Sequence, residues 1–313
     1  MSPDPYQNCR LCPRDCGVNR CEGELGVCGE SSEIRISHIG PHFGEEPSFT
    51  GTSGSGTIFF SGCSSRCFFC QNHQISTGHQ GKVYTPELFM TEVKELIERK
   101  VHNLNFVTPD HFWPHLRELC LGLREQEILI PSVFNCSGYQ KPGMVLEYSE
   151  FVDMFMPDMK FADGKLAGFC MNDRDYPEIA MEAIRRMVKT KGFLDPWDPT
   201  GRHAAKRGVL VRHLVLPGYV ENSLKVLDLL YHEFGPGIPL SVMSQFRPVR
   251  GCSEKHAMTR SLFPEEYDRV IEHVERLGFE KVYTQVLSER TDYLPDFNDP
   301  EDPFPGHKKK DGG

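Results

Sequence analysis

The run Thr57-Ile58-Phe59-Phe60-Ser61-Gly62-Cys63-Ser64-Ser65-Arg66-Cys67-Phe68-Phe69-Cys70-Gln71-Asn72 decides the interpretation of this chain. Its apolar first residues predict a strand, and Cys63, Cys67 and Cys70 follow that strand with C-x3-C-x2-C spacing. Thiolates are the usual protein ligands of iron–sulfur clusters. Three thiolates leave one iron of a four-iron cubane open, as a catalytic zinc site keeps a position for its reactant. Unrelated buried thiols or a zinc site are the alternatives, but zinc motifs favour paired C-x2-C units and these cysteines form one.

The cysteine motif, with the aromatic Phe69 before its third cysteine, resembles the signature of the radical S-adenosylmethionine (SAM) family. The resemblance implies that Cys63, Cys67 and Cys70 hold a 4Fe–4S cluster. It also implies that the fourth iron chelates the amino and carboxylate groups of SAM, and that the reduced cluster cleaves SAM to a 5′-deoxyadenosyl radical.

Length and composition indicate a globular protein. The chain has 313 residues, of which 25% are charged and 39% hydrophobic, enough for one large barrel domain and a small appendage. No stretch approaches the roughly 18 apolar residues of a membrane helix, and the N-terminus lacks the features of a signal peptide. We therefore expect a cytoplasmic protein with no membrane partner. The net charge of −9 argues against a nucleic-acid partner, because such proteins usually carry a basic face.

Apolar runs alternate with helical stretches from Thr57 onward, which predicts β/α units around a parallel sheet. The predicted strands are residues 57–61, 103–108, 128–135, 152–157, 208–216 and 239–244, with a last short strand at 282–284. The predicted helices are residues 86–99, 111–124, 141–148, 176–190, 221–234 and 264–277. These units predict an α/β fold, an incomplete TIM-like (β/α)6 barrel with a small N-terminal cysteine-rich metal-binding extension.

Four segments are predicted along the chain. Residues 1–32 form a cysteine-rich metal knuckle, and residues 33–56 form a connection of loops with one short strand at 34–36. Residues 57–290 form the radical SAM partial barrel. Residues 291–313 are polar, rich in proline and glycine, and predicted to be a flexible C-terminal tail.

The N-terminal knuckle offers Cys9, Cys12, Cys16 and Cys28 as a second metal site, with Cys21 to spare. Cysteines in a cytoplasmic chain indicate metal binding or catalysis rather than disulfides, and four thiolates in so short a segment favour a metal. Zinc and a second iron–sulfur cluster both fit: four-thiolate zinc is common, whereas the neighbouring redox chemistry favours a relay cluster. Free thiols in a flexible arm are the alternative.

Longer motifs resemble one branch of the radical SAM family, the uncharacterised relatives of pyruvate formate-lyase activating enzyme. The resemblance runs from residue 9 to about residue 285, and its most specific parts are Cys9–Arg20, His42–Pro47, Gly54–Cys63 and Arg212–Gly218.

The branch resemblance implies contacts with SAM. Asn72 stands where activating enzymes have an asparagine close to SAM, Asp158 and Lys160 resemble an Asp-x-Lys strand end, and His213 resembles a histidine near the SAM ribose. An ordinary ion pair and a buried core histidine are the alternatives. The usual glycine-rich turn that receives the SAM amino group is absent, and Thr108-Pro109-Asp110 stands there, so Thr108 is the candidate for that contact.

Further candidates lie at the ends of predicted strands, where barrel active sites are built. Asn135 and Ser137 are candidate SAM contacts, although both also fit as caps of the following helix. Cys136 is a candidate hydrogen-atom donor to a substrate radical, although free cysteine is usually a small buried hydrophobe. The candidates for substrate contact are His111, Tyr139 and Gln245.

Three functions compete. The first is an activase that abstracts a hydrogen atom from a glycine of a partner glycyl-radical enzyme, with an electron donor such as flavodoxin or ferredoxin. The second is a radical SAM enzyme that modifies a small molecule or a peptide. The third is a non-catalytic iron–sulfur or zinc protein. A peptide maturase with a C-terminal cluster domain is disfavoured, because only Cys252 follows Cys170.

Overall fold

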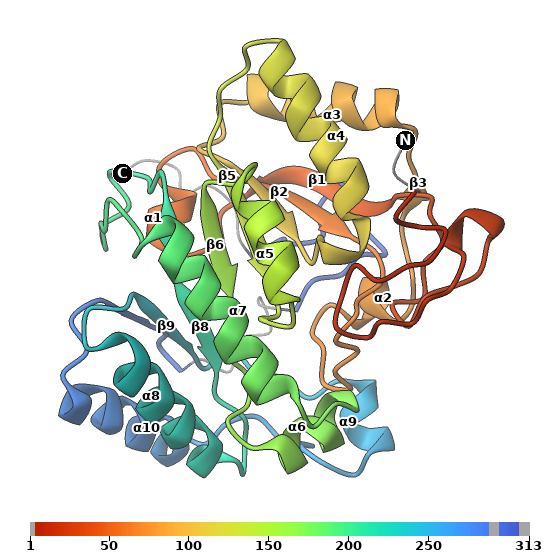
Figure 1. The fold of residues 1–313 in the computed structure, drawn as a ribbon. Coiled ribbons are helices and arrows are strands. Elements are labelled where there is room, and N and C mark those ends of the chain that lie inside the picture. Colours follow the sequence, from red (N-terminus) through yellow and green to blue (C-terminus); the bar gives the residue numbers. More distant parts are fainter. Residues whose placement is uncertain (1–3, 288–293, 307–313) are drawn as a thin grey trace.

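The computed structural model describes residues 4–287 and 294–306, and its centre is an open sheet of mostly parallel strands (Figure 1). One run of parallel neighbours consists of β2 (Ser55–Phe60), β4 (Leu104–Val107), β5 (Ser132–Cys136), β6 (Met154–Pro157) and β7 (Gly208–Val209). A second parallel sheet consists of β8 (Val211–Leu214), β9 (Leu240–Met243) and β10 (Val282–Thr284). A bridge between Asp158 and Arg212 connects β6 to β8, so the strands continue around an open curve, as in a partial barrel.

The predicted strand 208–216 is divided between these two sheets. The backbone N–H of Leu210 donates to the carbonyl oxygen of Phe155 in β6. The N–H of Val211 donates instead to the carbonyl oxygen of Pro239, the residue before β9. The chain therefore changes partners between Leu210 and Val211. The apolar pattern of this run does not reveal the change, because the strand is buried on both sides of it.

Two antiparallel strands extend the sheet beyond β2. β1 (Arg35–His42) pairs with β2, and β3 (Lys82–Val83) pairs with β1. The prediction of loops over residues 33–56 is wrong for most of that segment, which also contains α1 (Pro47–Thr50). Gly40 and Pro41 interrupt the apolar pattern of β1, so the sequence shows only its first residues as a strand.

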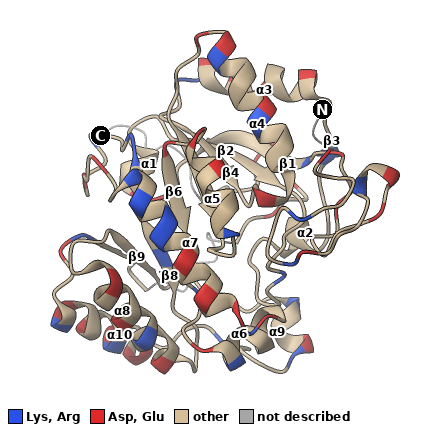
Figure 2. Ribbon diagram, viewed as in Figure 1, with Lys and Arg blue, Asp and Glu red and all other residues tan. Residues whose placement is uncertain are grey.

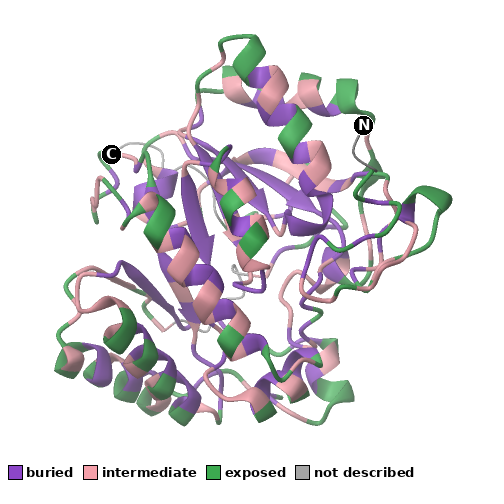
Figure 3. Cartoon of the chain, in the orientation of Figure 1, coloured by how far each residue is buried: buried purple, intermediate pink, exposed green. Residues whose placement is uncertain are grey.

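The six predicted helices are present and follow the strands. They are α3 (Pro86–Glu98), α4 (Trp113–Glu125), α5 (Pro142–Ser149), α7 (Tyr176–Lys191), α8 (Val220–Phe234) and α10 (Pro264–Leu277). Helix α3 begins as the sequence indicates: the Thr85 hydroxyl accepts the Leu88 N–H at 3.2 Å, and Pro86 starts the first turn. Figure 3 shows buried strands with helices whose outward sides are exposed.

Several short helices were not predicted from the sequence. The longest is α6 (Gly164–Met171), which begins at Asp163, whose carboxylate accepts the Leu166 N–H at 2.8 Å. The others are α1, α2 (His73–Ser76), α9 (Arg250–Glu254) and the 3-10 turns η1 (Arg20–Glu22) and η2 (Asp110–Phe112). Such short elements carry too little periodicity to be recognised in a sequence.

The main core lies between the sheet and the outer helices. Phe106, Phe134 and Phe155 come from three neighbouring strands and are fully buried. Phe134 stacks on Tyr148 of α5 with ring centroids 4.4 Å apart. Burying each such side chain contributes about 1.5–3 kcal/mol, so this core holds the strand ends in place.

The C-terminal segment, residues 294–306, is irregular as predicted, but it is packed against the sheet rather than free. Phe297 and Phe304 both contact the Phe59 ring of β2. The Phe297 N–H donates to Gln74 Oε1 at 2.8 Å, and Gln74 Nε2 donates to Asp296. The rest of the predicted tail, residues 291–293 and 307–313, lies outside the described residues.

The outer helices carry both acidic and basic side chains (Figure 2). Within residues 4–287 and 294–306, no helix combines the length and hydrophobicity needed to cross a bilayer.

Candidate active site

A cavity of about 550 Å³ lies where the strands end at their carboxyl sides. Its lining comes from β2, β4, β5, β6, β8, β9 and β10 or from the residues that follow them. It brings together most of the predicted site residues, namely Cys63, Cys67, Cys70, Asn72, Thr108, Asn135, Cys136, Ser137, Asp158, Lys160 and Gln245.

The loop that carries the three cysteines is held tightly on two sides. Gly62 precedes it with a φ of +77°, and a Cβ at this position would lie 2.5 Å from Glu30 and 2.9 Å from the Cys28 carbonyl oxygen. On the other side, a Cβ on Gly251 of α9 would lie 2.1 Å from the Phe68 carbonyl oxygen. Neither position has room for a side chain, so the loop lies directly against the backbone of its neighbours.

Cys63, Cys67 and Cys70 all line this one cavity, as the ligands of a single cluster must. Among the described residues, no group of three or more His, Cys, Asp or Glu converges on one metal ion. In a cubane each thiolate binds a different iron, so cysteines spread over one cavity wall are suitable ligands. Burial raises the pKa of Cys63 to about 11, so without metal these thiols are protonated, and cluster binding must release their protons.

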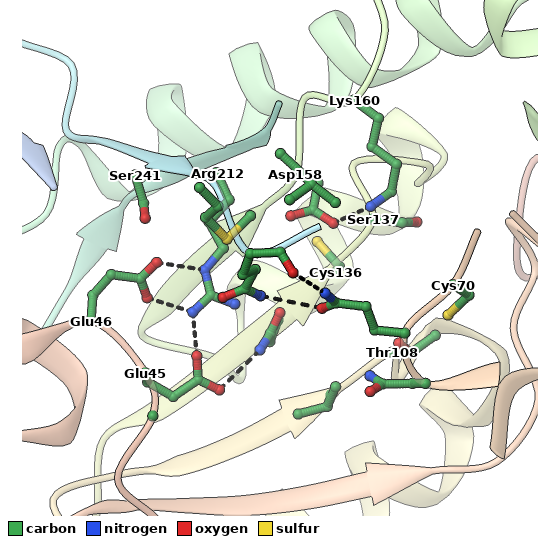
Figure 4. Close-up of a pocket in the computed structure, with 18 of the residues that line it drawn as sticks. Glu45, Glu46, Cys70, Thr108, Cys136, Ser137, Asp158, Lys160, Arg212 and Ser241 are labelled. Carbon is green, nitrogen blue, oxygen red and sulfur yellow. Dashed lines mark hydrogen bonds and ion pairs between the residues drawn. The ribbon is translucent and has the colours of Figure 1, made fainter. Parts of the chain in front are cut away.

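Asp158 and Lys160 form an ion pair on the cavity wall, with side chains 23% and 18% exposed (Figure 4). Burial acts to lower the pKa of Lys160, but Asp158, Cys67 and Tyr176 together outweigh burial and raise it, so the ammonium stays charged. A fixed pair of opposite charges in a cavity suits a ligand that carries both an ammonium and a carboxylate. That arrangement fits the SAM contact that the resemblance implies.

Replacing Asp158 with alanine is expected to weaken SAM binding by about tenfold or more, that is about 1.4 kcal/mol or more. The cluster absorbance should remain, because Asp158 lies in the cavity but supplies no thiolate. Equilibrium binding of SAM to the reconstituted protein measures the effect. An unchanged affinity would show that SAM binds elsewhere.

Thr108 has an unusual backbone conformation at the end of β4. Its φ of +56° lies in the left-handed region, which a β-branched residue rarely adopts. Its N–H donates to the Asn135 carbonyl oxygen at 2.8 Å, which holds the turn against β5. In the position where the family usually has a glycine-rich turn, Thr108 therefore adopts a backbone conformation that is normally taken by glycine.

Asn135 and Ser137 do not cap the helix that follows β5. The cap position of α5 is Lys141, and no side chain caps that helix. Ser137 instead accepts a hydrogen bond from Ser65 of the cysteine loop at 2.7 Å, and Asn135 Nδ2 donates to Glu45 at 3.4 Å. Both residues thus connect β5 to other parts of the cavity wall.

Three of the predicted SAM and substrate contacts do not line this cavity. His213 is buried, with Nδ1 against the Met159 carbonyl oxygen at 2.7 Å and Nε2 against Ser223 Oγ at 2.8 Å. Burial lowers the pKa of His213 to about 4. The structure therefore places His213 as a neutral, buried histidine outside the cavity lining, and its predicted contact with the SAM ribose stays a prediction.

His111 and Tyr139 are likewise placed outside the lining. His111 Nε2 lies 2.7 Å from the Ser61 carbonyl oxygen, and burial lowers the pKa of His111 to about 3. The Tyr139 hydroxyl donates to Asp173. Both side chains are fully or almost fully buried, so neither is accessible from the cavity.

Gln245 does line the cavity, as part of a chain of amides. Gln71 Nε2 donates to the Gln245 carbonyl oxygen at 2.6 Å, and Gln285 Nε2 donates to Gln245 Oε1 at 2.7 Å. This chain joins the cysteine loop to the ends of β9 and β10 across the open part of the barrel.

A charged cluster on the cavity wall was not predicted from the sequence. This carboxylate–arginine cluster consists of Glu45, Glu46 and Arg212, with side chains 7%, 8% and 13% exposed. Arg212 Nε donates to Glu46 Oε1 at 2.8 Å, and its Nη2 contacts both carboxylates. Glu45 and Glu46 belong to the motif His42–Pro47, and Arg212 begins the motif Arg212–Gly218. The presence of both motifs in one chain was the only sequence feature that could have indicated the cluster.

The N-terminal knuckle lies apart from the cavity lining. Cys9, Cys12 and Cys28 are buried and Cys16 is half-buried. The sulfurs of Cys16 and Cys28 both lie within 4 Å of the point where a Cβ on Gly26 would stand. Among the described residues, no three or more His, Cys, Asp or Glu side chains are placed to bind one metal ion. A metal in the knuckle therefore stays a prediction.

The Arg20 guanidinium is fully buried beside these thiols. It lies 3.6 Å from Cys9 Sγ and donates to the His111 carbonyl oxygen at 2.6 Å. Among residues 4–287 and 294–306 it forms no ion pair with a carboxylate, although its charge acts to lower the pKa of the buried Asp110. A buried cation needs a counter-charge, and thiolates bound to a metal would supply it.

The knuckle prediction is tested by metal analysis. A protein with Cys63, Cys67 and Cys70 all replaced by alanine is expected to retain zinc or iron, because Cys9, Cys12, Cys16 and Cys28 remain. Adding Cys12→Ala should remove that metal. If the first variant is already metal-free, the knuckle is only a thiol-rich arm.

Comparisons with known proteins agree with this site. The model of the Radical SAM superfamily matches residues 57–230. The uncharacterized protein MJ0674 of Methanocaldococcus jannaschii is 28% identical over 285 residues, which cover 89% of this chain and 77% of that protein.

Among solved structures, the FeFe-hydrogenase maturase HydG superposes with a TM-score of 0.50 at 15% identity, covering 74% of this chain and 51% of HydG. Streptococcus suis SuiB bound to S-adenosylmethionine gives a TM-score of 0.49 at 11% identity, covering 72% of this chain and 48% of SuiB. The chain thus spans about half the length of both proteins. The HydG match concerns the fold alone. The family match spans more than half of the chain and includes the three cysteines, so the protein is an enzyme of the radical SAM superfamily, whose cofactors are a 4Fe–4S cluster and SAM.

Proposed function

We propose that this enzyme takes a hydrogen atom from a small molecule held in the cavity between the cysteine loop and the carboxylate–arginine cluster. The observation that carries the proposal is the lining of the cavity. Cys63, Cys67 and Cys70 are part of the same lining as Glu45 and Arg212. Figure 4 draws Glu45, Glu46 and Arg212 on one side and Cys70 on the other. Charged groups beyond the predicted SAM contacts favour a second ligand.

The C-terminal segment favours a small molecule over a protein loop. Pro295 and Phe304 of that segment line the cavity, together with His42 and Phe59 of β1 and β2. They form one wall of the cavity and reduce the space through which a partner's loop could enter. A loop of a glycyl-radical enzyme would need to displace them, whereas a small molecule need not.

The residues of this chain have separate tasks in the proposed reaction. Cys63, Cys67 and Cys70 hold the cluster, and Asp158 with Lys160 orients SAM. A cluster held by these cysteines would supply the electron, taken from a donor such as flavodoxin or ferredoxin, for cleavage of SAM to methionine and a 5′-deoxyadenosyl radical, and that radical would take the substrate's hydrogen atom to give 5′-deoxyadenosine. Phe59, Phe69 and Phe304 contribute apolar surface to the lining, which limits the access of water to the reacting groups.

Cys136 keeps its proposed part as a hydrogen-atom donor to the product radical, and the thiyl radical left on its sulfur returns to the thiol by taking one electron from the same external donor and a proton from water. It lines the cavity and is 3% exposed. Burial raises its pKa, so it stays a thiol and retains the hydrogen atom that such a step requires.

The test is anaerobic reconstitution with iron, sulfide, SAM and a reductant. We expect a slow background release of 5′-deoxyadenosine and a clear stimulation by a small molecule. Stimulation only by a glycyl-radical enzyme, with a radical on its glycine, would assign the activase function that the branch resemblance implies. SAM that stays intact, or loses only its methyl group, would contradict the proposal.

A further inference from the structure

The carboxylate–arginine cluster carries more negative than positive charge. Glu46 is paired with Arg212 through two contacts, Nε to Oε1 and Nη2 to Oε2. Glu45 shares only the Nη2 of the same guanidinium. In the part of the chain that the structure describes, Arg212 is the one cation in an ion pair with either carboxylate. One carboxylate is therefore left without a full counter-charge.

Neutral groups hold Glu45 in this position. Asn105 Nδ2 donates to its Oε1 at 3.0 Å, and Asn135 Nδ2 donates to the same oxygen at 3.4 Å. These amides fix the carboxylate but do not cancel its charge. The Glu45 side chain is 7% exposed, so bulk water screens it poorly and an uncompensated charge there is costly.

The remaining charges of the lining do not compensate Glu45. Lys160 is paired with Asp158. Arg66 Nη1 donates to the Val27 carbonyl oxygen at 2.9 Å, which directs it toward the knuckle. Burial acts to lower the pKa of Arg212, but Glu45 and Glu46 outweigh burial and raise it, so Arg212 contributes a single permanent charge against two carboxylates.

From this surplus charge in the active cavity we propose that the substrate carries a cationic nitrogen, such as a primary ammonium group, and that Glu45 receives it. The inference rests on the proposed function, because it names the substrate class of the same cavity. An ammonium donates up to three hydrogen bonds, and the Glu45 carboxylate has lone pairs left to accept them. Charge-assisted bonds of this kind are among the strongest in proteins, so the ammonium end of the substrate is held and its reactive carbon faces the cysteine loop.

The test uses the reconstituted holoenzyme with SAM and three probe series of equal chain length: propylamine to pentylamine, the matching 1-alkanols and the matching carboxylates. Anaerobic titration calorimetry measures their affinities. We expect the amines to bind about tenfold or more tighter than the alcohols. Glu45→Gln preserves the shape and removes the charge, so it should abolish this preference. Glu254→Gln, at an exposed surface pair, should retain it.

Each outcome decides the matter. Equal binding of amines and alcohols, or tighter binding of carboxylates, would overturn the substrate class. A preference that survives Glu45→Gln would overturn the role of Glu45. If Glu45→Gln does not fold, Glu46→Gln makes the same change of charge and should likewise lose the preference. Release of 5′-deoxyadenosine by the wild-type enzyme tests the proposed function separately, so cleavage of SAM without a preference for amines overturns this inference alone.

Discussion

Cys67→Ala is expected to remove the catalytic cluster, with the loss of about four irons per chain and of all SAM cleavage, because three thiolates are the smallest set that anchors a cubane with one open iron. Cys67 lies in the middle of the motif and is 7% exposed. Iron analysis, the visible absorbance of the cluster and release of 5′-deoxyadenosine measure the effect.

Cys120→Ala is the matched control. Cys120 is also 7% exposed, but it belongs to α4 and does not line the cavity. The Cys120→Ala variant should keep its iron and its activity, because the substitution removes a thiol that is equally buried but is not a predicted cluster ligand. SAM cleavage that persists in the Cys67 variant, or in a variant that lacks all three motif cysteines, would refute the assignment of the cluster.

Arg212→Leu should cause the largest loss of folding stability. It leaves Glu45 and Glu46 side by side, with side chains 7% and 8% exposed and no cation between them. Removing one partner of a buried ion pair typically costs about 3–5 kcal/mol. Denaturant unfolding of the full chain measures this loss.

Arg250→Leu is the control for that measurement. Arg250 is 85% exposed and pairs with Glu254 on the surface of α9, and such pairs contribute less than about 1 kcal/mol. Similar losses of unfolding free energy in the two variants would contradict the account, because they would show that the Arg212 guanidinium contributes no more to stability than a surface ion pair.

The sequence predicts the fold well where periodicity is strong. The six long helices are found within about two residues of their predicted ends. Their apolar periodicity defines them locally, and five of them have proline in the first turn. The division of residues 208–216 between two sheets was not predictable, since a change of partner strand leaves no local trace. The packing of the C-terminal segment depends on Phe297 and Phe304 meeting Phe59, a contact between distant parts of the chain.

The sequence predicts the cavity-lining residues that stand at the carboxyl ends of predicted strands. Asp158, Thr108 and Asn135 line the cavity because the parallel strands that carry them end at the same side of the sheet. His213 also lies in a strand, but its side chain points to the core, where Ser223 of α8 meets it. Glu45 was missed because the loop after β1 reaches the cavity only through the antiparallel pairing of β1 with β2.

Deuterium transfer from substrate to cofactor product tests the central claim most directly. A compound that stimulates turnover, deuterated at its carbon positions, is incubated with the wild-type enzyme, SAM and reductant, and the 5′-deoxyadenosine is analysed by mass spectrometry. The account predicts deuterium in 5′-deoxyadenosine, because the 5′-deoxyadenosyl radical takes its hydrogen atom from the molecule in the cavity. Unlabelled 5′-deoxyadenosine from every fully deuterated compound that stimulates turnover would contradict it.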